Sequence, residues 1–200
     1  KKFDVTRFDF TKPMSAKDGA KFMKESGLLD LISDRTIKSI PDYFLGVEVG
    51  LDSNGRKNRS GTSMESLAEL FIPASVTEIG NEAFHYCSGI ERIVVEDGNE
   101  VFYSKNNCLI HDENKTLLLA CNDSVIPDDG SVEVIYDHAF SNCKKIESII
   151  LPEAIERIDR YAFSGCSALK TIQLTKSLCG DNPWDSGYGE GLFEDCSSLE

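Results

Sequence analysis

The stretch that decides the fold reads A-F-S-N-C-K-K-I-E-S-I-I-L-P and covers residues 139–152. Its opening pattern, two apolar residues followed by any two residues and a cysteine, occurs at residues 83–87, 139–143, 162–166 and 192–196. Self-similarity of this kind is the sequence signature of a repeat architecture. The second half of the chain is therefore predicted to be an array of short repeats.

A short run rich in β-branched residues follows three of the four cysteines, which predicts a strand in each repeat. These runs lie at residues 90–95, 146–151 and 169–174. A proline then marks each repeat junction, where a missing N–H is tolerated because the strand has ended. These prolines are Pro73, Pro127 and Pro152.

The spacing between repeats sets the size of one coil. Phe140 and Phe163 are 23 residues apart, within the roughly 20–29 residues of a leucine-rich repeat. One coil has too little apolar surface to fold alone, whereas stacked coils bury Phe and Ile side chains at about 1.5–3 kcal/mol each. We therefore expect an α/β repeat solenoid in which strands of successive coils pair in parallel on the concave face.

This pattern, L/I-P-x(n)-I-x-x-x-A-F-x-x-C-x-x-L-x-x-I-x-L, resembles the BspA-like leucine-rich repeats, a family of surface and adhesion-type proteins. The resemblance covers residues 72–200. It implies a module that binds a protein or a glycan through its repeat face, at the cell surface or after secretion. The longer repeat between Phe84 and Phe140 resembles the hairpin-bearing repeats of that family, with an insertion near residues 99–121 and a turn at Asn114-Lys115.

Charge divides the chain near residue 70. Residues 1–70 carry 12 Lys and Arg against 11 Asp and Glu, which leaves 9 against 23 for residues 71–200, so the halves net +1 and −14. The shift predicts two domains, 1–70 and 71–200, the first of them small, mixed and mainly helical. An acidic second half repels phosphate backbones, so any contact with nucleic acid is expected in the first. No apolar run reaches the roughly 18 residues of a membrane helix, so no membrane contact is expected.

The cysteines of the repeated pattern are predicted to form a buried ladder in which sulfur acts as a small hydrophobe. They are Cys87, Cys143, Cys166 and Cys196. Cys108 and Cys121 lie on the two arms of the predicted hairpin, where they either stay free or form a disulfide. No C-x-x-C or H-x-x-x-H pair occurs, so no metal site is expected.

The histidines and the aromatic residues of one insertion do not form a recognisable functional motif. The three histidines, His85, His111 and His138, stand at unrelated repeat positions and are expected to be solvated or to cap turns. Residues 181–191 interrupt a regular coil and contain Trp184 and Tyr188. These aromatic side chains either bind a partner or fold back over the solenoid.

A basic loop in the first domain carries Arg56, Lys57, Asn58 and Arg59, donors that suit phosphate or base-edge contacts. The surrounding string V-G-L-D-S-N-G-R-K-N-R-S-G-T-S-M-E, residues 49–65, resembles the GATC-specific type II restriction endonucleases of the DpnII group. That resemblance implies DNA contacts by the basic loop and a Mg²⁺-dependent site to which Glu65 and, less directly, Asp52 belong.

The resemblance also shows what is missing. The family's catalytic strand should follow the helix that begins at Met64, but the chain instead enters the repeats at Phe71. We therefore expect a non-catalytic macromolecule-binding module that needs no cofactor and binds DNA weakly through its basic loop. The alternative is a fragment of a Mg²⁺-dependent, cytoplasmic endonuclease. The repeats reach residue 200 without a polar capping repeat, so a longer protein is expected.

Overall fold

The computed structural model describes residues 39–40, 69–80, 83–84, 89–176, 178 and 190–200. Within these ranges the regular secondary structure consists of strands. Their bounds are β1 (Ser39–Ile40), β2 (Glu69–Ile72), β3 (Glu78–Ile79), β4 (Arg92–Val95), β5 (Phe102–Lys105), β6 (Cys108–His111), β7 (Thr116–Leu119), β8 (Val134–Ile135), β9 (Ser148–Ile150), β10 (Arg157–Ile158) and β11 (Thr171–Gln173).

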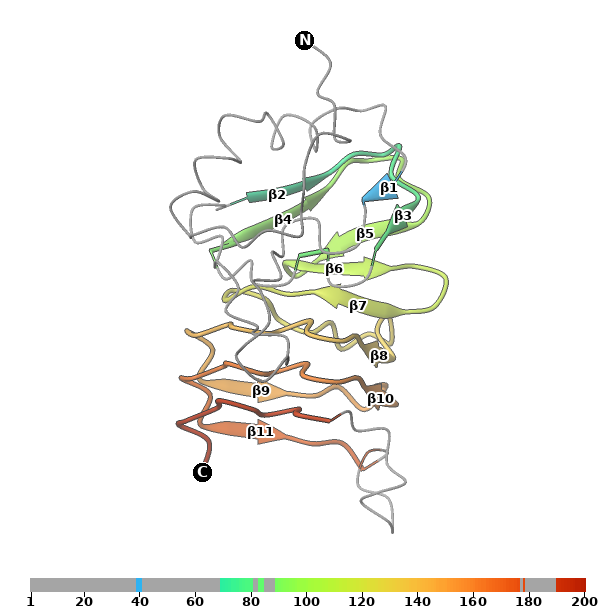
Figure 1. Cartoon of the computed structure of the whole chain (residues 1–200). Helices are drawn as coiled ribbons and strands as arrows, with labels where there is room; N and C mark the ends of the chain where they lie inside the picture. The colour runs from blue at the N-terminus through green and yellow to red at the C-terminus, as the bar shows by residue number, and fades with distance from the viewer. Residues whose placement is uncertain (1–38, 41–68, 81–82, 85–88, 177, 179–189) are drawn as a thin grey trace, which may run out of the picture.

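The coils stack along one axis from β2 and β4 to β11 (Figure 1). Each regular coil contributes a first strand and, after the proline turn, a second strand of two residues. The first strands pair in parallel as β2 with β4 and β9 with β11. The second strands pair in parallel as β1 with β3 and β8 with β10. The predicted solenoid with parallel strands is confirmed.

The α part of the predicted α/β repeat is wrong for the described coils. After β8 and after β10 the chain turns through the Ala-Phe segment instead of forming a helix. Two residues per coil have positive φ there, such as His138 at 58° and Asn142 at 62°. A left-handed residue every four positions cannot be accommodated in an α-helix, so the segment closes as successive turns.

The helix expected in residues 1–70 lies outside the described residues. Of that segment the structure describes β1 and the first two residues of β2. Ile40 of β1 pairs with Ile79, is 2% exposed and packs in the same core as the first coil. This part of the first seventy residues therefore supplies a rung of the second-strand ladder.

The predicted hairpin insertion is a three-stranded meander, β5–β6–β7. Asn106 and Asn107 join β5 to β6 with φ of 49° and 64°, the left-handed pair required by a two-residue hairpin turn. The predicted Asn114-Lys115 turn joins β6 to β7, and Lys115 has φ of 48°. β7 then pairs in parallel with β8, so the meander becomes part of a five-stranded sheet of order β10-β8-β7-β6-β5.

Two hydrophobic clusters meet at this meander. Between Leu109 and Ile110 the register of β6 against β7 shifts, and these neighbours pair with Leu119 and Leu117. Leu109 packs in an upper cluster with residues of β2 and β4, whereas Ile110 packs in a lower cluster with residues of β8, β9 and β10. In the lower cluster the rings of Phe140 and Phe163 lie 5.2 Å apart. The meander thus joins two stacks of coils that would otherwise have separate cores.

The cysteine ladder is confirmed where the structure describes it, and its thiols are also hydrogen-bond donors. Cys143 and Cys166 are buried, and Cys196 is partly buried. The Cys166 thiol donates to the carbonyl oxygen of Phe140 at 3.1 Å, and the Cys196 thiol donates to that of Phe163 at the same distance. Each thiol therefore ties its coil to the preceding one.

A disulfide between Cys108 and Cys121 is not formed, and both thiols are free. Cys108 packs in the lower cluster and Cys121 in the upper one. The register shift in the β6–β7 pair explains this result, because it places the two side chains on opposite faces of the meander.

Thiol labelling tests the ladder. Burial raises the pKa of the Cys166 thiol to about 12 and that of Cys143 well above its usual value. Since the thiolate is the reactive form, we expect both to react with iodoacetamide far more slowly than Cys196 in the native protein. Mass spectrometry after timed quenching measures this order, and unfolding in urea should remove it. Native labelling of Cys143 as fast as of Cys196 would contradict the buried ladder.

Candidate interaction surfaces

One side of the solenoid is formed by the outward side chains of β2, β4, β9 and β11 and of residues 124–126, and we call it the first-strand face. Val125 and Ile150 stand on it at equivalent positions, two residues before Pro127 and Pro152. Their side chains are 65% and 68% exposed, whereas the next residues, Ile126 and Leu151, are buried. An apolar side chain is therefore exposed just before the junction proline in two successive coils, and for Ile150 of β9 this follows from alternation along the strand.

Ion pairs between neighbouring coils lie on the same side. Arg92 contacts Glu69 at 3.2 Å and Lys170 contacts Glu147 at 2.8 Å. All four side chains are more than half exposed, so these pairs contribute little to stability. They form instead a charged border beside the apolar positions.

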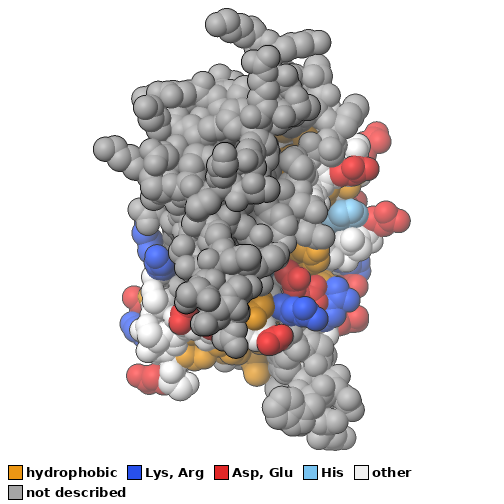
Figure 2. Space-filling model, in the orientation of Figure 1, with side chains coloured by type: hydrophobic (Ala, Val, Ile, Leu, Met, Phe, Trp, Pro, Cys, Tyr) orange, Lys and Arg blue, Asp and Glu red, His pale blue; other side chains and the backbone are white. Residues whose placement is uncertain are grey.

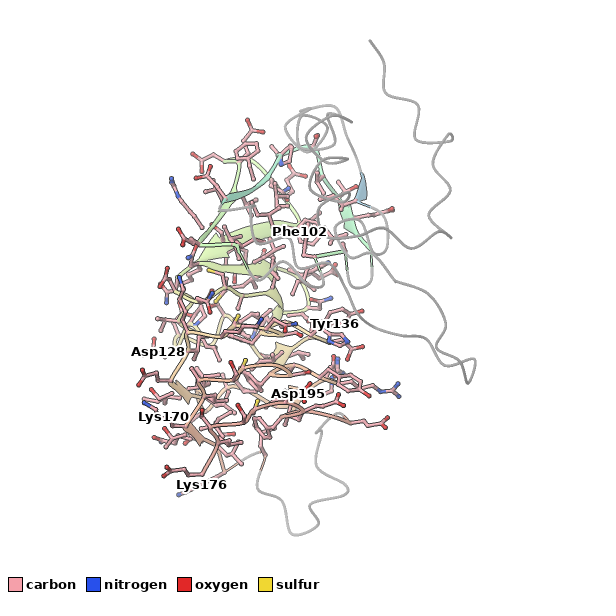
Figure 3. The ribbon with its side chains drawn as sticks, turned by 60° about the vertical axis from the view of Figure 1, so that its left-hand side comes forward. Phe102, Asp128, Tyr136, Lys170, Lys176 and Asp195 are labelled. Atoms are coloured by element: carbon pink, nitrogen blue, oxygen red, sulfur yellow. The ribbon has the colours of Figure 1, made fainter. Side chains whose placement is uncertain are left out.

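A cavity of about 390 Å³ lies on the other side of the solenoid. Figure 3 shows the two sides apart, with Tyr136 of the cavity on one and Lys170 on the other. The cavity is bounded by β3 and the following turn, by the meander, and by the ends of β8 and β10. The lining side chains that matter chemically are Glu78, Phe84, Phe102, His111, Tyr136, Asp137, His138 and Arg157.

The structure brings together two histidines that the sequence left unrelated. His111 and His138 are half-buried and line the same cavity. The His111 ring meets Phe102 edge to face at 5.3 Å, and its buried Nδ1 has no hydrogen-bond partner among the described residues. His138 stacks on Tyr161 of the next coil at 5.1 Å. The sequence left open whether these histidines are solvated or cap turns; both are partly exposed, and the carbonyl oxygen of His138 accepts a hydrogen bond from the N–H of Ser141 at 2.9 Å in the following turn.

Charge in the cavity is predominantly acidic. Arg157 donates to both carboxylate oxygens of Asp159, at 2.7 and 3.3 Å, so its charge is matched outside the cavity. Asp137 accepts a hydrogen bond from the backbone N–H of Arg160 at 2.7 Å. Burial nonetheless raises the pKa of the Asp137 carboxyl above its usual value, with a further contribution from the nearby Asp159. Figure 2 shows acidic, basic and histidine side chains together at the right-hand edge of the molecule.

The site residues predicted from sequence lie outside the described residues. This holds for the proposed catalytic pair Glu65 and Asp52, for the basic loop of Arg56, Lys57, Asn58 and Arg59, and for Trp184 and Tyr188. His85 and Cys87 also lie outside the described residues. Among the residues that are described, no group of three or more His, Cys, Asp or Glu side chains is placed to hold a metal ion.

The cavity was missed because its walls come from separate repeats. Glu78, His111 and Asp137 are far apart in sequence and occur in no motif. The one local signal is the segment Y-D-H before Ala139, where polar and aromatic residues fill positions between the second strand and the turn. The exposed position of Ile150 could have been inferred from strand alternation in the run I-I-L-P.

Comparison with known proteins identifies both halves. A model described as DpnII restriction endonuclease matches residues 1–123, more than half of the chain. The chain belongs to the DpnII restriction endonuclease family. The matched range includes β2 to β7, so in this family member these strands of the first coils and the meander take part in the solenoid. The predicted resemblance of the first seventy residues is confirmed.

Curated relatives are type II restriction enzymes. The chain is 34% identical to DpnII of Streptococcus pneumoniae over 118 residues, which covers 52% of this chain and 41% of that enzyme. It is 54% identical to MjaIII of Methanocaldococcus jannaschii over 52 residues, which covers 26% of this chain and 18% of that enzyme. The matches thus span about two fifths or less of the length of these relatives.

The repeats match a second model, the BspA type leucine rich repeat region, in 6 copies over residues 119–200. A leucine rich cell surface protein from Faecalibacterium prausnitzii has a similar structure, with 26% identity and a TM-score of 0.55 over 66% of this chain and 34% of that one. The pneumococcal vaccine antigen PcpA shares the fold at 21% identity and a TM-score of 0.56, over 66% and 37%. The solenoid therefore has the leucine-rich repeat fold.

The described strands and turns include no helix of the length and apolarity that crossing a bilayer requires.

Proposed function

We propose that this chain is a non-catalytic interaction module that binds a protein or a glycan through its first-strand face. The exposure of Val125 and Ile150 at equivalent positions of successive coils supports this function. Burying a large aliphatic side chain is worth about 1.5–3 kcal/mol, so a partner that covers both gains a substantial part of its affinity there. The inter-coil ion pairs then form the polar rim typical of protein interfaces.

The proposed place of action is the cell surface or the outside of the cell. The resemblance to BspA-type repeats and the likeness to a leucine rich cell surface protein support this location. No cofactor is required for such binding.

A binding screen tests the proposed function. Binding of the full chain to immobilised panels of glycans and of extracellular proteins is measured and compared with binding of a Val125→Asp/Ile150→Asp variant. We expect at least about tenfold weaker binding of the variant to any specific partner, because two buried apolar contacts are replaced by desolvated charges. A control with Asp112→Asn and Glu113→Gln changes two exposed side chains in the β6–β7 turn and should bind like the parent. Equal binding by all three proteins would overturn the assignment to this face.

A second candidate function is site-specific cleavage of DNA at GATC, supported by membership of the DpnII family. In that case Glu65 and Asp52 would help to hold Mg²⁺, which would supply electrostatic stabilisation and an activated water. Arg56, Lys57, Asn58 and Arg59 would contact the DNA.

Digestion of unmethylated GATC duplexes separates the two candidates. The interaction proposal predicts intact DNA after incubation with the chain and Mg²⁺, at any protein concentration. Cleavage that is lost in Glu65→Gln and on chelation with EDTA, but kept in the surface variant Glu69→Gln, would establish the nuclease function instead.

A further inference from the structure

We propose that the cavity between β3, the meander and the ends of β8 and β10 binds a cationic group, the side chain of a lysine or arginine on a basic protein partner. This site goes beyond the proposed function, because Tyr136 of its lining lies on the opposite side of the solenoid from Lys170, which belongs to the charged border of the first-strand face (Figure 3). A partner could engage either surface without the other.

The shape of the cavity fits a single side chain. Its volume of about 390 Å³ is at the small end of the roughly 300–1,000 Å³ of ligand pockets. Phe84 and Phe102 are almost fully buried beside it, so their rings give it rigid apolar walls. The methylene stem of a lysine or arginine can lie along such walls while its charged end reaches a polar rim.

The charge of the cavity selects a cation. Glu78 and Asp137 line it, whereas the charge of Arg157, the described cation in the lining, is already matched by Asp159. Burial raises the pKa of the Asp137 carboxyl although the nearby Arg160 and Arg157 act in the opposite direction, so a further positive charge would stabilise its ionised form. An anionic ligand would instead be repelled by both carboxylates.

Aromatic faces add to this preference. Tyr136 lines the cavity, and the face of a tyrosine ring attracts a guanidinium or an ammonium group. Residues 71–200 also carry a net charge of −14, from 9 Lys and Arg against 23 Asp and Glu. A field of that sign steers basic partners toward the solenoid.

The test uses Nα-acetyl-arginine amide and its neutral isostere Nα-acetyl-citrulline amide, with the full chain at low salt. Binding is followed by chemical-shift changes of isotope-labelled protein. We expect the arginine compound to bind at least about fivefold more tightly than the citrulline compound, since only the former is charged. Shifts should be largest at Tyr136 and His138. Equal affinities of the two compounds would overturn the proposal.

Matched amide variants assign the binding to the cavity. Asp137→Asn keeps an oxygen that can accept the hydrogen bond from Arg160, so the fold should be retained while arginine binding weakens about fivefold. Glu78→Gln should act in the same direction. Asp128→Asn removes an exposed charge on the opposite edge (Figure 3) and should leave binding unchanged. Equal losses in Asp137→Asn and Asp128→Asn would show general screening and overturn the site.

Competition by other ligands completes the test. If glucose or galactose displaces the arginine compound and binds more tightly, the cavity is a sugar site and the proposal is wrong. The outcome is independent of the first-strand face, since a Val125→Asp/Ile150→Asp variant should bind the arginine compound like the parent.

Discussion

Replacing Phe163 with alanine is expected to lower the free energy of unfolding by about 3–5 kcal/mol. The Phe163 side chain is fully buried. Its ring lies 5.2 Å from that of Phe140 in one neighbouring coil and 5.8 Å from that of Phe193 in the other. Removing it leaves a cavity shared by three coils, whose backbones are fixed by inter-coil hydrogen bonds and cannot close the gap. Urea titration followed by circular dichroism measures the change.

Phe193→Ala is the matched control. Phe193 stacks on Phe163 on one side and is only partly buried. Its replacement should cost about 1–2 kcal/mol, because a partly exposed ring loses less burial and water can fill the space it leaves. A loss below about 1 kcal/mol for Phe163→Ala, or equal losses for the two variants, would contradict the stacking order of the ladder.

The first strands and the cysteine ladder could be predicted from sequence because both are periodic. Residues that share a position in successive coils share an environment, so four copies of one pattern reveal which side chains face inward. Ile149 and Cys166 are buried for this reason. The exposure of Ile150 follows from the same alternation, although its role in binding does not.

The second strands could not be predicted because they are only two residues long. Val134 and Ile135 have the β-branched side chains of a strand, but two residues carry no detectable alternation. Their strand geometry comes from hydrogen bonds between coils, such as that from the N–H of Asp159 to the carbonyl oxygen of Ile135 at 2.8 Å. Such contacts join residues from different repeats and leave no local mark in the sequence.

The meander was only partly predicted. Its Asn114-Lys115 turn was recognised, but the Asn106-Asn107 turn was not, although two asparagines at adjacent positions suit a left-handed hairpin turn. The register shift between Leu109 and Ile110, which separates Cys108 from Cys121, was not predicted either. The acidic cavity could not be predicted because its walls depend on the path of the meander. The meander brings His111 into one lining with residues of β3 and residues that follow β8.

Part of the solenoid lies within the range that matches the DpnII family. Residues 1–123 match the DpnII family, yet Ile40 and β2 to β7 contribute to the stacked coils. Because Ile40 is buried in the core of the first coil, the first part of the chain covers apolar surface that an isolated repeat array would expose. The boundary near residue 70 remains a prediction from charge and composition.

Replacing Gly191 with alanine is expected to destabilise the last described coil by about 2–4 kcal/mol, which combines the strain of a left-handed residue with overpacking. Gly191 has φ of 65°, and a Cβ there would lie 2.1 Å from Cε1 of Tyr161. Tyr161 cannot easily move away, because its ring stacks on His138 of the coil above at 5.1 Å and the two planes differ by 5°. The three residues form one column of left-handed positions, and the Tyr161 ring fills the space beside Gly191.

Gly98→Ala separates the two causes. Gly98 also has positive φ, 89°, but nothing lies within 4 Å of a Cβ built on it. Its replacement therefore adds only backbone strain, about 1 kcal/mol. Thermal and urea unfolding of both variants should show Gly191→Ala to be the more destabilised, and Gly191→Ala combined with Tyr161→Ala should recover part of the loss, because the smaller side chain frees the space that the new methyl group needs. If Gly191→Ala and Gly98→Ala lose the same stability, the Tyr161 ring does not lie against Gly191 and the column is not packed as described.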